Sequence, residues 1–139
     1  MSNMLIVPAE IVWYLRSGVH IALNEVADDI AEAAIGYERQ AHPEWFTGLF
    51  ERFDAVRALL DAVGWSVPGV KDLDGVEVDI DAHRDELVRA LKVQLVVEED
   101  ISRGLDGKNS EKADRDLAVE RERELREFVE RVMPRLVEG

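Results

Sequence analysis

The sequence predicts an all-α fold, an antiparallel four-helix bundle built from two helical hairpins with a long, partly apolar connection between helices two and three. Apolar residues recur at steps of three and four through most of the chain, which is the spacing of a helix face. Two short breaks, near residues 41 to 43 and 105 to 109, require the flanking helices to run antiparallel. The length of 139 residues is close to the commonest domain size, so we predict one helical domain over residues 1–139.

The first hairpin is predicted over residues 8 to 64. An apolar stripe at helical spacing runs from Pro8 to about residue 40, and proline suits a first helical turn. His42 and Pro43 end this helix because proline disfavours the α conformation in the residue before it. A second helix then runs from Pro43 to about Gly64, since glycine commonly follows the last helical residue.

Residues 65 to 80 are the one long irregular connection. Helix one is about ten residues longer than helix two, so its N-terminal part projects past its hairpin partner and needs a cover. We predict that the connection folds back over it as a lid through its apolar residues Trp65, Val67, Val70, Leu73, Val76 and Val78. The Asp74-Gly75 pair also allows a short β-hairpin that would pair residues 70 to 73 with 76 to 79.

The second hairpin is predicted from about residue 82 onward. Helix three ends near Gly104, and helix four starts near Asn109 or Ser110, either of which can cap it. With the turn centred near residue 107, Glu98 is expected at the level of Arg115. Glu98 falls on the apolar side of its helix, so it needs a polar partner there.

Asp79, Asp81 and His83 stand where the connection meets helix three. On a β-strand these side chains would share one face and could contact a single cation. The helical pattern of Leu87 and Leu91, however, extends back to about residue 82, so the three do not share a face. We interpret Asp79 or Asp81 as the N-cap, whose carboxylate accepts hydrogen bonds from free backbone amides.

Charge and composition exclude several classes of function. The net charge of −13 repels phosphate backbones and anionic lipid headgroups, so we expect binding to neither nucleic acid nor membrane, while a basic protein partner remains open. The chain has no cysteine, which excludes disulfides, thiolate nucleophiles and cysteine-ligated zinc. Pro8 and Glu10 interrupt the N-terminal apolar run and no basic residue precedes it, so we expect a cytoplasmic protein without a signal peptide.

The strongest candidate for metal chemistry is a set of five acidic residues on the first hairpin: Asp28, Asp29, Glu32, Glu51 and Asp54. A turn at residues 41 to 42 puts Glu32 at the level of Glu51 and Asp29 at that of Asp54. This pattern is similar to the one by which all-α nucleotide pyrophosphohydrolases hold Mg²⁺, where acidic residues from two helices ligate the ion and the ion orients the phosphates. The resemblance implies a Mg²⁺-dependent nucleotide pyrophosphohydrolase with these five residues as metal ligands.

The helical angles favour a different role for the same five residues. At about 100° per residue, Glu51 and Asp54 lie well over 100° from the apolar stripe of helix two, and Asp28 and Glu32 are likewise far from the stripe of helix one. Aspartate also stands where the first metal-binding motif of those enzymes has a pair of glutamates. We therefore interpret the five carboxylates as a solvated face and keep the metal site as the alternative.

Apolar residues in excess of what two hairpins can bury predict self-association. Trp13 lies in the projecting end of helix one, and Val93, Val96 and Val97 help to surround helix three with apolar side chains. A two-fold dimer is the commonest way to bury a second face. We therefore expect a non-enzymatic helical interaction module that needs no cofactor and forms a homodimer. Its interface candidates are Trp13, Val93, Val96 and Val97, and no catalytic residue is assigned.

Overall fold

A computed structural model describes residues 3–36, 42–64, 75–105 and 111–137. In chain order the described elements are β1 (Met4–Val7), α1 (Ala9–Ile35), α3 (Pro43–Val63), β2 (Val76–Asp79), α4 (Ile80–Leu105) and α5 (Lys112–Val137). Each of the four predicted helices is present, and the all-α class is confirmed. The two strands form a small sheet in addition to the helices.

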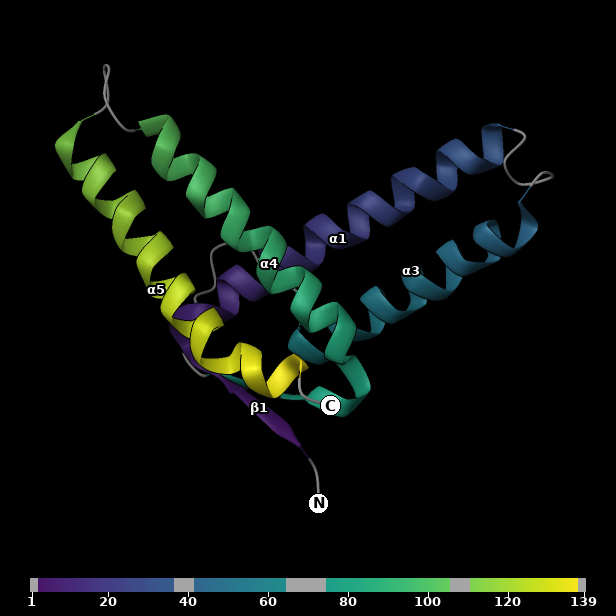
Figure 1. Cartoon of the computed structure of the whole chain (residues 1–139), viewed down its shortest axis with the longest axis horizontal. Helices are drawn as coiled ribbons and strands as arrows, with labels where there is room; N and C mark the ends of the chain where they lie inside the picture. The colour runs from purple at the N-terminus through teal and green to yellow at the C-terminus, as the bar shows by residue number, and fades with distance from the viewer. Residues whose placement is uncertain (1–2, 37–41, 65–74, 106–110, 138–139) are drawn as a thin grey trace.

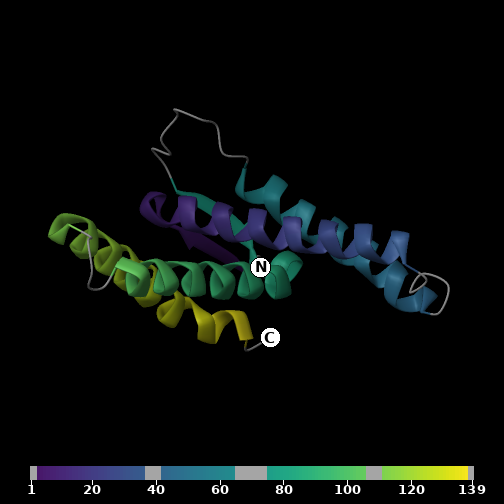
Figure 2. The same ribbon diagram turned by 90° about the horizontal axis from the view of Figure 1, so that it is seen from above.

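The four helices pair as two hairpins that cross where α1 packs on α4 (Figure 1). α1 lies beside α3, and α4 lies beside α5. Beyond the crossing the two hairpins diverge, so their far ends lie on opposite sides of the molecule (Figures 1 and 2). The core shared by all four helices is therefore confined to the region of the crossing, and a bundle aligned along one axis is not confirmed.

Proline and glycine set the start of α1 and both ends of α3, as the sequence predicts. α1 ends at Ile35, earlier than the predicted end near residue 40, and Gly36 is its C-cap. Pro8 precedes α1, and its carbonyl accepts hydrogen bonds from the backbone amides of Ile11 and Val12 at 2.9 and 3.1 Å. Pro43 is the first residue of α3. Gly64 ends α3 with φ of 82°, a backbone conformation that glycine adopts without steric cost.

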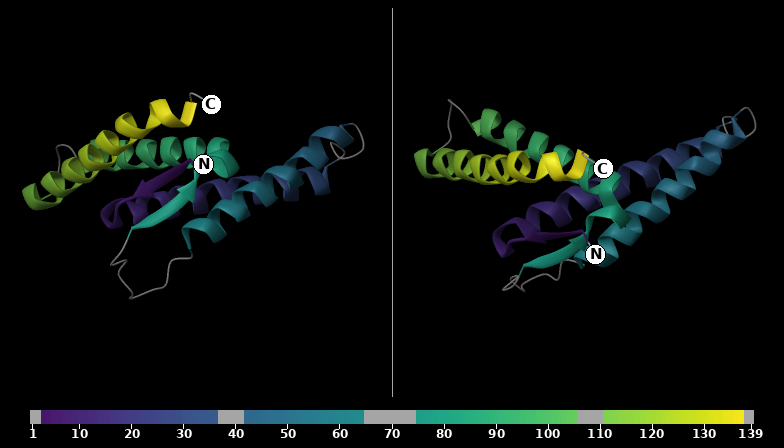
Figure 3. Two further views of the ribbon diagram at one scale, coloured as in Figure 1. Left: turned by 90° about the horizontal axis from the view of Figure 1, so that it is seen from below. Right: turned by 60° about the horizontal axis from the view of Figure 1, so that its bottom comes forward.

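The sheet joins two segments far apart in the sequence. β1 and β2 run antiparallel, with Met4 opposite Asp79 and Val7 opposite Val76. Residues 70 to 73, the partner considered for β2, lie outside the described residues. The strand predicted at residues 76 to 79 is present, and it pairs with the N-terminal segment. The physical reason is burial, because Val7 and Val78 enter the common core when these strands pair. Figure 3 shows the strands side by side near the C-terminal end of α3.

Part of the predicted lid lies outside the described residues. Trp65, Val67, Val70 and Leu73 belong to this part of the chain, so the lid stays a prediction for them. Val76 and Val78 belong to β2, where Val78 is fully buried and Val76 packs against the core.

Asp79 is the N-cap of α4. Its carboxylate Oδ1 accepts hydrogen bonds from the backbone amides of Asp81 at 3.0 Å and Ala82 at 3.4 Å. Asp81 instead pairs with Arg84 at 3.0 Å, on the surface. His83 has non-helical backbone angles, φ of −130° and ψ of 16°, so the first turn of α4 is irregular and the regular helix follows it. The interpretation of this segment as a capped helix start is confirmed.

The buried side chains form two clusters. The larger cluster lies at the crossing and takes residues from both strands and all four helices. Its largest fully buried side chains include Leu5, Leu15, Leu59, Leu60, Ile80, Leu87, Leu91, Leu125 and Leu136. The smaller cluster fills the outer part of the first hairpin and consists of Val26, Ala33 and Leu49, with Ile30, Phe46 and Phe53 packed against them.

The register of the second hairpin differs from the expected one. Glu99 of α4 pairs with Arg126 of α5 at 3.2 Å, whereas the expected register puts Arg115 at this level. α5 begins at Lys112, later than the predicted start near Asn109 or Ser110. A later start places residues of higher number in α5 beside each residue of α4, as the Glu99–Arg126 pair shows. Glu98 is buried, and its polar partner comes from its own helix, because Gln94 Nε2 donates a hydrogen bond to Glu98 Oε1 at 3.1 Å.

Candidate functional site

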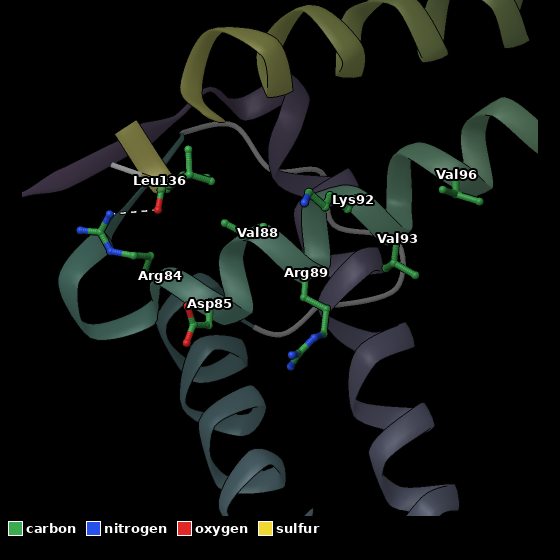
Figure 4. A pocket seen from close by; sticks show the side chains of 9 residues that line it. Arg84, Asp85, Val88, Arg89, Lys92, Val93, Val96 and Leu136 are labelled. Carbon is green, nitrogen blue, oxygen red and sulfur yellow. Dashed lines mark hydrogen bonds between the residues drawn. The ribbon is translucent and has the colours of Figure 1, made fainter. Parts of the chain in front are cut away.

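An open groove of about 670 Å³ runs along the outer face of α4 and is closed at one end by the last turn of α5 (Figure 4). Its lining residues are Arg84, Asp85, Val88, Arg89, Lys92, Val93, Val96, Leu136 and Val137. These residues come from α4 and from the last turn of its hairpin partner α5. The volume of the groove exceeds those of four other surface hollows, which measure about 220 to 380 Å³.

Arg84 holds the two walls of the groove together. Its Nη1 donates hydrogen bonds to the backbone carbonyls of Leu136 at 2.9 Å and Arg135 at 3.3 Å, and Figure 4 shows the guanidinium pointing at Leu136. A cation at the C-terminal end of α5 also complements the negative end of the helix dipole. Arg135 in turn donates to the carbonyl of Met4 at 2.9 Å. Hydrogen bonds of Arg84 and Arg135 therefore connect α4, α5 and β1 at the closed end of the groove.

The floor of the groove is apolar. Val88, Val93 and Val96 lie five and three positions apart along α4, and all three line the groove and keep part of their side chain accessible. Val96 is the most accessible of them, at 52% exposed. Val137 extends the apolar surface onto α5 and is 61% exposed. The chain's own helices thus leave the apolar side chains of the groove partly uncovered.

The rim of the groove is charged and mostly basic. Arg84, Arg89 and Lys92 face one acidic residue, Asp85, in a chain whose net charge is −13. Arg89 is already bonded to Glu86 at 2.9 Å, within α4. The groove therefore has an apolar centre and a polar edge, which is the arrangement seen in protein–protein interfaces.

The structure brings together two of the four predicted interface residues. Val93 and Val96 line the groove, whereas Val97 is half-buried on the adjoining side of α4. Trp13 lies on α1 and is 53% exposed, with its ring edge-on to Tyr14 at 5.2 Å between centroids. It lines two smaller surface hollows with other residues and does not reach the groove. Trp13 and the groove are separate surfaces.

The five acidic residues proposed as metal ligands lie along the first hairpin. Asp28, Glu32, Glu51 and Asp54 are exposed and Asp29 is half-buried. The interior between α1 and α3 is filled by the smaller apolar cluster, so the inward faces of both helices are occupied by other side chains. In the described part of the chain no three histidine or acidic side chains come together in a group that could hold a metal ion.

A buried polar contact between Gln94 and Glu98 lies next to the crossing of the two hairpins, and the sequence predicted only part of it. Gln94 and Glu98 are 1% and 3% exposed and are hydrogen-bonded to each other, and Tyr14 of α1 is buried nearby. Burial, followed by the charges of Glu124 and Glu98, raises the pKa of the Tyr14 phenol. Tyr14 therefore stays neutral well above neutral pH. The sequence indicates Glu98, because a carboxylate interrupts an apolar face, but no periodic signal marks Tyr14.

Glu124 of α5 lies at the edge of the same region. Burial raises the pKa of its carboxyl group, and the nearby carboxylates Glu10 and Glu120 add to this effect. Arg123 acts in the opposite direction without cancelling it. Glu10 of α1 thus lies close enough to Glu124 of α5 for their like charges to repel.

Comparison of the chain with protein-family models, curated proteins and solved structures finds no significant match. Within the described ranges, no helix combines the length and the apolar character needed to cross a membrane.

Proposed function

We propose that this chain is a non-enzymatic helical interaction module of the cytoplasm that self-associates as a homodimer, with the groove on the outer face of α4 as its contact surface. The observation that carries the proposal is the partly uncovered apolar lining of the groove, formed by Val88, Val93 and Val96 of α4 and Val137 of α5. The absence of cysteine fits a reducing compartment.

The groove is favoured over the other exposed apolar residues because several apolar side chains line it together. Single apolar residues on a surface are ordinary, whereas a continuous patch with a polar rim is typical of a surface that binds another protein. Leu117 and Val119 of α5 are exposed to a similar degree as Val96, but they lie outside the groove. Trp13 is the second candidate surface, since its indole would bury a large apolar area.

Sedimentation equilibrium at micromolar concentration tests self-association. We expect a species of twice the chain mass of 15.7 kDa. Val96→Glu should weaken the dimer and raise the dissociation constant at least about tenfold, because two carboxylates per dimer would be moved from water into the apolar centre of the contact. The matched control is Val119→Glu, which introduces the same charge at a position 55% exposed and outside the groove.

The outcomes separate the candidate surfaces. A wild-type chain that sediments only at 15.7 kDa would contradict self-association. A dimer that survives Val93→Glu and Val96→Glu but is lost in Trp13→Glu would move the contact to the projecting end of α1. Circular dichroism melts of each variant show whether the monomer fold is intact, which is expected because Val96 and Trp13 are about half exposed.

A further inference from the structure

The outer face of α4 carries an ordered series of charges around its exposed valines. At about 100° per residue, five charged residues lie within about 40° of the direction of Val96. They are Asp85, Arg89, Lys92, Asp100 and Arg103, and all five are exposed. All five follow His83, the residue with non-helical backbone angles, so the rotation of about 100° per residue holds along the whole series.

The series is self-complementary when one copy of the helix is reversed. From the N-terminal end the signs run negative at Asp85, positive at Arg89 and Lys92, then negative at Asp100 and positive at Arg103, with Val93 and Val96 in the middle. An antiparallel copy with its Val96 beside Val93 places Asp85 opposite Arg103 and Arg89 opposite Asp100. A two-fold axis repeats both pairs on the other side of the valines.

We propose that a second copy of this chain docks on the outer face of α4 in the antiparallel orientation, about a two-fold axis that passes between Val93 and Val96. This inference rests on the proposed self-association and specifies its partner surface and geometry. The contact is isologous, because the same face of α4 serves both copies. Val93 and Val96 exclude water at the centre, and the charges of the rim fix the direction and the register.

The charge series disfavours the other ways of placing a second helix on this face. A parallel copy in register would put Asp85 against Asp85 and Arg103 against Arg103, and like charges in contact are destabilising. Asp85 and Arg103 are eighteen positions apart and so about 27 Å apart along one helix, which prevents them from pairing within a chain. Any energetic coupling between Asp85 and Arg103 must therefore act between copies.

The rim charges contribute to orientation more than to affinity. Arg103 is already 3.8 Å from Asp100 and 3.9 Å from Glu99 in its own chain, and Arg89 is bonded to Glu86. Each contact between copies therefore replaces or shares an existing one, and exposed ion pairs are weak in any case. Reversing a charge has a larger effect than removing it, since it creates two like-charge contacts per dimer.

The test uses Asp85→Arg and Arg103→Asp, measured by sedimentation equilibrium alone and as an equimolar mixture. At each end of the proposed dimer, residue 85 of one copy lies opposite residue 103 of the other, and we call this pair an end contact. Each variant alone should dimerise about tenfold more weakly than the wild type, because both end contacts then join like charges. These are two cations in Asp85→Arg and two carboxylates in Arg103→Asp. The mixture should form a heterodimer in which one end contact joins the two substituted positions and the other joins the two native ones. Both contacts then join opposite charges, so we expect nearly the wild-type dissociation constant. The double variant Asp85→Arg/Arg103→Asp should also recover it.

The controls separate this geometry from a general effect of charge. Asp85→Arg makes the chain less acidic, which by itself would favour association of a chain with net charge −13, so a weaker dimer is the opposite of the non-specific result. Asp114→Arg and Lys112→Asp make the same charge changes on exposed positions of α5, outside this face, and should not show rescue on mixing.

Two experimental outcomes distinguish failure of the antiparallel α4 contact from failure of self-association. If the wild type dimerises but mixing gives no tighter dimer than the single variants, the antiparallel α4 contact is wrong while self-association stands. If the wild type is a monomer, the proposed function itself fails. Recovery in both the mixture and the double variant supports the antiparallel two-fold arrangement.

Discussion

Gly18 of α1 lies directly against the backbone of Ala90 in α4. A Cβ atom added to Gly18 would sit 2.9 Å from the carbonyl carbon of Ala90 and closer still to its oxygen. Both residues are buried, so the two helix backbones cross here with no side chain between them. This contact belongs to the packing of α1 on α4, where the two hairpins cross (Figure 1).

We expect Gly18→Ala to destabilise the fold by up to about 2 kcal/mol. Alanine favours a helix over glycine by about 1 kcal/mol, but the new methyl group meets backbone atoms that cannot rotate away, and overpacking of this kind costs about 1–3 kcal/mol. The matched control is Gly48→Ala in α3, where an added Cβ meets nothing within 4 Å and a gain of about 0.5–1 kcal/mol is expected. Urea unfolding that shows both variants equally stabilised would contradict the close crossing.

The same contact shows which parts of the fold the sequence predicts. The helix ends at Pro43, Gly64 and Asp79 were predicted because each depends on backbone groups within one turn. The crossing at Gly18 was not, because a glycine in mid-helix carries no periodic signal and its partner, Ala90, is far away in the sequence. The pairing of β1 with β2 was missed for the same reason, since strand pairing depends on distant segments.

The groove was predicted only in part. The excess of apolar residues on α4 identified Val93 and Val96, because that signal lies within one helix. Leu136 and Val137 were not identified, since their place depends on the register of α5, which Arg84 fixes through backbone carbonyls. The outward orientation of the acidic residues on the first hairpin was predicted because helical angles alone determine it.

The N-cap assignment predicts unequal effects of two neighbouring aspartates. Asp79→Ala should lower the free energy of unfolding by about 1 kcal/mol, because two backbone amides of the first turn of α4 lose their acceptor. Asp81→Ala removes only a surface ion pair with Arg84, and a change of at most about 0.5 kcal/mol is expected. Equal losses in denaturant melts of the two variants would be inconsistent with Asp79 as the cap.

Glu124 predicts a pH dependence of stability. Its pKa is raised in the folded chain by burial and by neighbouring carboxylates, so the folded state binds the proton more tightly than the unfolded state. The resulting stability is complete below the ordinary pKa of glutamate and is lost as the pH rises through the raised value. Glu124→Gln should therefore raise Tm at about pH 7 and change it much less at about pH 4. A larger gain at the acidic pH than at the neutral one would contradict the direction of the shift.

Addition of Mg²⁺ tests the alternative reading of the acidic residues on the first hairpin. A ligand that binds only the folded chain at a hundred times its dissociation constant stabilises it by about 2.7 kcal/mol, a shift of several degrees. We expect no specific rise in Tm up to about 10 mM MgCl₂, beyond what an equal ionic strength of NaCl produces. A rise that is lost in both Asp29→Asn and Asp54→Asn would favour the pyrophosphohydrolase.

The buried pair of Gln94 and Glu98 predicts strong coupling between two substitutions. Gln94→Leu alone removes the hydrogen-bond donor of a carboxylate that is 3% exposed, and a loss of about 3 kcal/mol is expected. Glu98→Leu alone leaves the amide of Gln94, whose Oε1 already has no partner among the described residues, without its remaining contact, at a cost of about 1–3 kcal/mol.

The double variant Gln94→Leu/Glu98→Leu should be close to the wild type in stability, or above it, because a fully apolar contact of similar volume replaces a partly satisfied polar one. Urea unfolding of the four chains gives the coupling energy, which should be well beyond the experimental error of about 0.5 kcal/mol. Simple additivity of the two single losses would show that the side chains do not depend on each other, and the hydrogen bond between Gln94 and Glu98 would then carry no energy.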